Sequence, residues 1–153
     1  MEDEKYKILE HPSDVKIQAF GKTKEELFLN AMLGMNAILK PKIVSNEPEV
    51  ARKIKLASVD ENALLVDFLS EVLYLIQTNK VIYNNVKFSK FSDHSNSSGQ
   101  VELEGELSGN KVESFNEDIK GVTYHGLKID QPRLASGEAG QNGLYEAVIL
   151  FDI

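Results

Sequence analysis

Apolar side chains recur along this chain with two different periods. In 15–19 they alternate with polar residues, which predicts a strand with one buried face that ends at Gly21. In 24–39 and again in 61–77 they recur at helical spacing, which predicts two amphipathic helices. Pro41 ends the first helix, because the residue before a proline is driven out of the helical region.

Both predicted helices begin at residues that suit a helix N-terminus. Thr23 and Glu26 form a capping box, in which the hydroxyl accepts from the amide of residue 26 and the carboxylate returns to the amide of residue 23. Residues 58–61 predict a second capping box before the longer helix. The apolar face of that helix is wider than one stripe, so we expect the sheet and a further element to cover it.

The remaining apolar segments complete a sheet. Further strands are predicted at 6–10, 50–57, 81–91, 101–107 and 145–151. Residues 108–110 are interpreted as a turn, and the last strand is apolar on both faces, which is typical of a central strand. Strands and two helices without regular βαβ alternation predict an α+β fold, a two-layer sandwich of a mixed β-sheet with two main helices.

The segment 117–129 contains the densest cluster of reactive side chains. Lys120, Thr123 and His125 fall within it beside Gly121, where a bulge or a ligand can approach the backbone. Its Val, Thr, Tyr and Ile content predicts a strand. By the period of two, Thr123 and His125 share a face, and Lys120 faces the other way unless the chain bulges. The plain alternative is a half-buried strand with polar residues on its wet face.

Composition narrows the class of protein. The 153 residues match one ordinary domain, and 42% hydrophobic residues are enough for a core. No apolar run approaches the about 20 residues of a membrane helix, and the acidic N-terminus is not a signal peptide, so we expect no membrane contact and a cytoplasmic location. Without cysteine there are no disulfides or thiolate metal sites, and the three histidines show no local zinc spacing.

The formal net charge of −7 limits the partners. Only 17 Lys and Arg residues are spread along the chain, which argues against a broad RNA- or DNA-binding face. The acidic balance fits a protein partner or a hard cation better. The sequence contains no phosphate-binding loop, dinucleotide fingerprint or nucleophile elbow.

Two aspartates are candidate metal ligands. Asp14 follows a proline turn at the start of a strand, and Asp152 closes the last strand beside the terminal carboxylate on Ile153. Hard cations such as Ca²⁺ and Mg²⁺ prefer sets of oxygen ligands of this kind, although a third ligand must come from elsewhere in the fold. The alternatives are an Asx-turn for Asp14 and a solvated terminus for Asp152.

Several blocks of the chain resemble the archease family. They are 11–14 (His-Pro-Ser-Asp), 21–28, 64–75, 119–125 (Ile-Lys-Gly-Val-Thr-Tyr-His) and 147–153, in the same order over nearly the whole chain. The resemblance implies one archease-like domain over 1–153 with a compact two-layer fold. It also implies an accessory protein, not an enzyme, that assists the GTP-dependent tRNA-splicing RNA ligase.

That ligase joins an RNA 2′,3′-cyclic phosphate or 3′-phosphate end to a 5′-hydroxyl. The resemblance implies that this protein promotes ligase guanylylation and multiple turnover in tRNA splicing and RNA repair, and meets nucleic acid only indirectly. It further implies a divalent-cation site, usually described as calcium, at Asp14, Asp152 and the Ile153 carboxylate. Lys120 and His125 are expected to face the partner, together with Thr123.

Two other functions are compatible with the residues. One is a stand-alone small hydrolase or nuclease that uses His125 as base and Lys120 as oxyanion partner. The other is a nucleic-acid binder or chaperone, against which the net charge of −7 counts.

Overall fold

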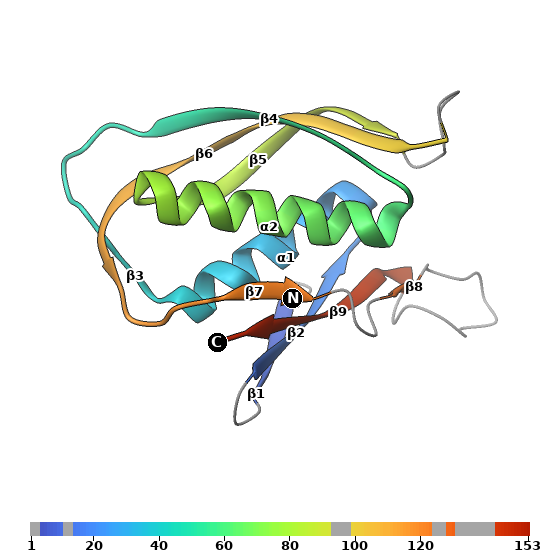
Figure 1. Ribbon diagram of the computed structural model, residues 1–153, viewed down its shortest axis with the longest axis horizontal. Coiled ribbons are helices and arrows are strands. Elements are labelled where there is room, and N and C mark those ends of the chain that lie inside the picture. Colours follow the sequence, from blue (N-terminus) through green and yellow to red (C-terminus); the bar gives the residue numbers. More distant parts are fainter. Residues whose placement is uncertain (1–3, 11–13, 93–98, 124–127, 131–142) are drawn as a thin grey trace.

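The computed structural model describes residues 4–10, 14–92, 99–123, 128–130 and 143–153 (Figure 1). Its elements, in chain order, are β1 (Tyr6–Glu10), β2 (Asp14–Gly21), α1 (Lys24–Leu39), β3 (Pro41–Ile43), β4 (Val50–Ser58), α2 (Glu61–Asn79), β5 (Val81–Ser92), β6 (Val101–Phe115), β7 (Gly121–Thr123), β8 (Ile129–Asp130) and β9 (Tyr145–Asp152). All three histidines lie outside the described residues, as does most of the predicted loop 130–143.

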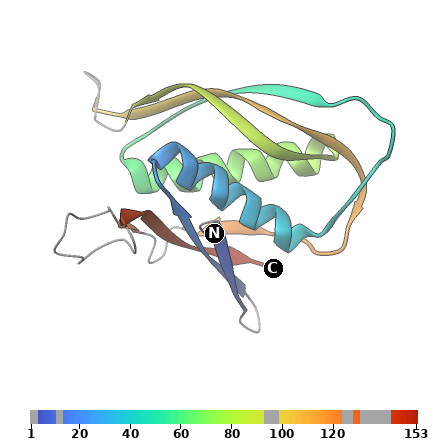
Figure 2. The ribbon, with the colours of Figure 1, turned by 180° about the vertical axis from the view of Figure 1, so that it is seen from behind.

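Both helices lie in one layer between two β-sheets (Figures 1 and 2). One sheet has the strand order β1-β2-β9-β7, with β8 also paired to β9. In the other sheet β6 pairs with β3, β4 and β5. Every described pairing is antiparallel. Buried apolar side chains from both sheets and both helices form one hydrophobic core.

The predicted α+β class with two main helices is confirmed. The strands, which the sequence placed in one mixed sheet on one side of the helices, form two antiparallel sheets that cover the helices from both sides. The reason lies in α2, where residues 63–66 are all buried. A helix with apolar residues around its circumference needs cover on more than one side. Among the described residues neither helix is long and apolar enough to cross a membrane.

The first helix is confirmed together with its N-cap. The hydroxyl of Thr23 accepts from the Glu26 amide at 3.1 Å. The Glu26 carboxylate accepts from the amide of Lys22 at 3.2 Å, one residue earlier than predicted. The helix ends before Lys40, which adopts a left-handed backbone with φ 49° and donates its amide back to the last turn.

The second helix is confirmed, but its predicted capping box is wrong. Asp60 is the N-cap, and its carboxylate accepts from the Ala63 amide at 2.8 Å. Ser58 instead ends β4 and donates its hydroxyl to Asp67 at 2.5 Å. The strand continues one residue further than predicted, to Ser58, so the serine points at the side of the helix and not at its end.

The predicted turn at 108–110 is also wrong, because these residues lie inside the long strand β6. Gly109 serves a close approach between strands: a Cβ there would overlap the carbonyl oxygen of Ile82 on β5. The prediction of a central last strand is confirmed, because β9 lies between β2 on one side and β7 and β8 on the other.

Candidate functional site

The two predicted aspartate ligands meet at one end of the five-stranded sheet. Asp14 begins β2 and Asp152 ends β9, and they are direct partners in the antiparallel register. Residues directly opposed in such a pair have Cα atoms about 4.5–5.5 Å apart and side chains on the same face. The pairing therefore places two carboxylates from opposite ends of the chain beside each other, near the point marked C in Figure 1.

The aspartate pair faces away from the helices. Val15 and Phe151, the neighbouring partners in the register, are buried in the core. Because successive strand residues point to opposite faces, Asp14 and Asp152 point to the outer face of the sheet. Asp152 is exposed there and open to a ligand from outside, whereas Asp14 is half-buried.

The environment of the pair suits a cation. Like charges directly opposed on neighbouring strands are destabilising. In addition, Oδ1 of Asp14 is shielded from solvent and has no hydrogen-bond partner among the described residues. A buried anionic oxygen without a partner is costly, and a hard cation would both satisfy it and cancel the repulsion.

Two carboxylate side chains do not complete a metal site. Within the described part of the chain, no three His, Cys, Asp or Glu side chains cluster closely enough to hold a metal ion. A third protein ligand from this part of the chain would therefore be an oxygen of another kind: a side-chain amide or hydroxyl, a main-chain carbonyl or a terminal carboxylate. Ile153, which is half-buried and directly follows Asp152, is the residue predicted to supply this ligand, and its role stays a prediction.

The reactive segment borders the aspartate pair, and of its described residues Gly121–Thr123 and Ile129–Asp130 form the predicted strand structure, whereas 118–120 and 128 do not. β7 and β8 pair separately with β9, and residues 124–127 between them lie outside the described set. Gly121 is the register partner of Asp152, and the Lys120 amide donates to the Asp152 carbonyl at 2.6 Å. A Cβ on Gly121 would meet nothing within 4 Å, so the space beside Asp152 is open.

Two of the three predicted partner-facing residues have described positions. Lys120 is exposed next to the aspartate pair. Thr123 opposes Leu150, two residues before Asp152, and therefore lies on the same outer face. His125 is outside the described residues, so its predicted role stays a prediction, as does the enzyme alternative that depends on it.

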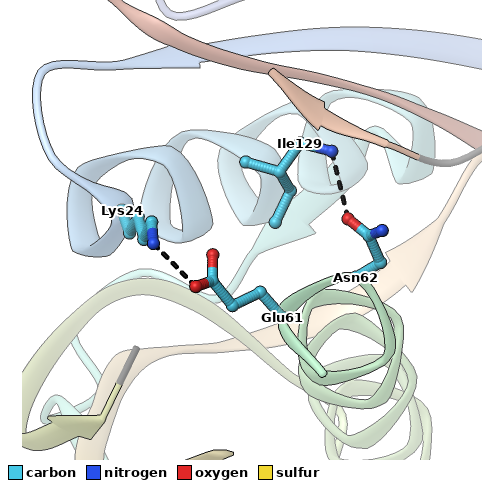
Figure 3. A network of polar contacts seen from close by, with 4 residues as sticks. All are labelled: Lys24, Glu61, Asn62 and Ile129. Atoms are coloured by element: carbon cyan, nitrogen blue, oxygen red, sulfur yellow. Dashed lines mark hydrogen bonds and ion pairs between the residues drawn. The ribbon is translucent and has the colours of Figure 1, made fainter. Parts of the chain in front are cut away.

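Sequence reasoning missed a polar network where the two helices begin (Figure 3). The Lys24 ammonium lies 2.7 Å from a Glu61 carboxylate oxygen, and the Asn62 side-chain oxygen accepts from the Ile129 amide at 3.0 Å. Lys24 is buried, and its ammonium lies 5.7 Å from the centre of the Tyr145 ring. The network joins both helix starts to β8. No local pattern predicts it, because each partner belongs to a distant segment.

The fold and the site together define a class: α+β proteins with two helices between antiparallel sheets and a carboxylate pair where the last strand ends. The family model described as "Archease protein family (MTH1598/TM1083)" matches residues 6–153. The chain belongs to the archease family.

Relatives cover most of the chain. A protein archease from Methanosarcina barkeri is 37% identical over 129 residues, which cover 81% of this chain and 85% of the relative. One from Methanosarcina mazei is 37% identical over 132 residues, or 83% and 87% of the two chains.

Two solved structures show the same fold. The solution structure of protein 1598 from Methanobacterium thermoautotrophicum has a TM-score of 0.68 at 23% identity and covers 97% of this chain and 98% of that one. The crystal structure of an archease from Thermotoga maritima, described as a possible chaperone, has a TM-score of 0.62 at 19% identity, with coverage of 99% and 100%.

Proposed function

We propose that this protein is an accessory protein of a GTP-dependent tRNA-splicing RNA ligase. It promotes ligase guanylylation and multiple turnover in tRNA splicing and RNA repair, and is not itself the ligase. Membership of the archease family over residues 6–153 supports this role. The description of the Thermotoga maritima relative as a possible chaperone agrees with a helper protein. A cytoplasmic location is part of the same proposal.

The proposal includes a divalent cation, with calcium as the first candidate, held by Asp14, Asp152 and the carboxylate of Ile153. The single observation on which it depends is the direct pairing of the two aspartates in the register of β2 and β9. The buried Asp14 oxygen without a partner among the described residues supports it. When bound, the cation would supply positive charge that orients a carboxylate or phosphate oxygen of the partner.

The residues around the pair would form the ligase-facing edge. Lys120 holds the Asp152 main chain through its amide and presents its exposed side chain to solvent. Thr123 lies on the same outer face, and His125 belongs to the same segment. The net charge of −7 fits contact with RNA through the ligase better than direct binding.

A guanylylation assay tests both parts of the proposal. The ligase is incubated with GTP and metal, with and without this protein, and wild type is compared with Asp14→Asn and Asp152→Asn. The matched control is Glu49→Gln, which neutralises an exposed carboxylate outside the site. No acceleration by wild type would reject the accessory role. Acceleration that survives both aspartate substitutions would reject only the metal role.

The alternative is a stand-alone hydrolase or nuclease that uses His125 and Lys120. Purified protein that turns over RNA or nucleotides in the absence of the ligase, and loses that activity in His125→Ala, would favour it. Steeply salt-dependent RNA binding by the purified protein would instead indicate a nucleic-acid binder.

A further inference from the structure

A small pocket with both apolar and charged residues in its wall lies behind the aspartate pair, on the helix-facing side of the same strand ends. It has a volume of about 230 Å³ and is lined by Ile8, Val15, Ala37, Ile38, Lys40, Glu117 and Ile153. Val15 directly follows Asp14, and Ile153 directly follows Asp152. Strand alternation therefore puts the aspartates on one face of the sheet end and these pocket walls on the other.

We propose that this pocket receives one large apolar side chain of the protein partner, so that the partner holds the sheet end from both faces. The inference rests on the proposed function, which requires a protein partner at the aspartate pair. The pocket is continuous with that site through Ile153, which lines the pocket and carries the predicted third cation ligand.

The size of the pocket fits this occupant. An apolar cavity of about 150 Å³ takes a benzene ring, so about 230 Å³ accommodates a leucine, methionine or phenylalanine side chain. The wall residue Ile8 remains 40% exposed, which is a large fraction for an isoleucine that faces the helices. A partner side chain would cover it.

The charges at the pocket favour a peptide segment over a purely apolar molecule. Lys40 and Glu117 contribute one positive and one negative group to the lining. Neither side chain makes an ion pair or a hydrogen bond with another described residue. A protein segment supplies polar groups of both signs beside its apolar side chain, and so matches a pocket whose wall combines apolar side chains with a cation and an anion.

Filling the pocket tests the proposal. Ala37 is half-buried on α1, and Ala37→Phe occupies the space from within. Val59→Phe is the matched control, because it adds the same side chain at a position 70% exposed and outside the pocket. In the ligase guanylylation assay we expect Ala37→Phe to raise the half-saturating concentration about 10- to 100-fold, or about 1.4–2.8 kcal/mol. Calcium binding to the isolated variant, measured by calorimetry, should stay at the wild-type level.

A second pair of variants tests the pocket independently, in case Ala37→Phe does not fold. Ile8→Ser removes apolar surface from the pocket, and Ile43→Ser removes a similarly exposed isoleucine from the other sheet. The proposal predicts weaker stimulation for Ile8→Ser only. Equal half-saturating concentrations for wild type, Ala37→Phe and Ile8→Ser would overturn it.

The proposed function and this inference fail in different ways. A wild-type protein that does not stimulate the ligase defeats the proposed function itself. A wild type that stimulates, with pocket variants that stimulate equally well, defeats only the pocket. A wild-type dimer in sedimentation experiments that Ala37→Phe dissociates would assign the pocket to a second copy of this chain and overturn the partner proposal.

Discussion

The amide of Lys120 donates a hydrogen bond to the carbonyl oxygen of Asp152 at 2.6 Å. This bond attaches the reactive segment to the strand end that presents the aspartate pair. The bond uses only the main chain of Asp152, so the side-chain carboxylate of the same residue takes no part in it. A change of the Asp152 side chain is therefore expected to affect the proposed cation site, with the pairing of β7 preserved.

Asp14→Asn is predicted to have opposite effects with and without calcium. In a chelator, the substitution removes the repulsion between directly opposed carboxylates, so Tm should rise by about 2–4 °C, corresponding to about 1 kcal/mol. With excess calcium, wild type should be stabilised and the variant should not, because stabilisation by a ligand depends on its binding to the folded state. Thermal unfolding followed by circular dichroism measures both effects.

Glu49→Gln provides the control for this experiment, since it removes one negative charge from an exposed position away from the site. Its Tm should follow wild type in both conditions. An equal calcium response in wild type and Asp14→Asn would contradict the metal role of Asp14.

Gly34→Leu is predicted to destabilise the fold through overpacking. A Cβ at Gly34 would lie 2.9 Å from two methyl carbons of Ile17 and 3.2 Å from the Tyr6 ring, so α1 would have to move off the sheet. The expected cost is about 1–3 kcal/mol in the free energy of unfolding, measured with urea. Gly121→Ala is the comparison, because a Cβ there meets nothing within 4 Å, and its unfolding should match wild type.

The Lys24–Glu61 ion pair is predicted to matter for stability. The Lys24 side chain is 9% exposed and that of Glu61 is 22% exposed, so Glu61→Gln removes the negative charge 2.7 Å from a largely buried ammonium. We expect a loss of about 1–2 kcal/mol, less than for a fully buried pair because solvent still reaches the carboxylate. Glu113→Gln should cost less than about 0.5 kcal/mol, because the Lys42–Glu113 pair is 72% and 54% exposed. Equal urea midpoints for the two variants would contradict this account.

The ammonium of Lys90 is predicted to lose its proton at a higher pH than an unperturbed lysine, because its pKa is raised. Its hydrogen bond to Glu102 and the charge of that carboxylate raise the pKa of Lys90 above 10.5. Because the folded-state pKa is raised, the small stabilising effect of this exposed pair is fully present below about pH 10.5 and is lost as the pH rises through the folded-state value. Glu102→Gln should lower the pKa of Lys90, which NMR titration of its side chain detects. A curve that does not move would contradict the pairing.

Local sequence was enough to predict α1 and the alternation of β2. Thr23 caps the helix, an apolar face repeats at helical spacing, and Pro41 follows the end, so every signal lies within a few residues of the element it defines. Local sequence gave a wrong prediction where contact with a distant segment determines the structure. Gly109 resembles a turn residue, but it lies within β6, where the absence of a side chain allows β5 to approach closely.

The same distinction applies to the site. The sequence by itself singled out the candidate groups of the site, because Asp14, Asp152 and Lys120 stand out by residue type and by their place at or beside strand ends. Only the tertiary structure decided that the two aspartates oppose each other, that Lys120 bonds to Asp152, and that a pocket lies behind them. The register between two strands depends on segments far apart in the chain, and so does the packing of a helix between two sheets. No local sequence pattern encodes either of them.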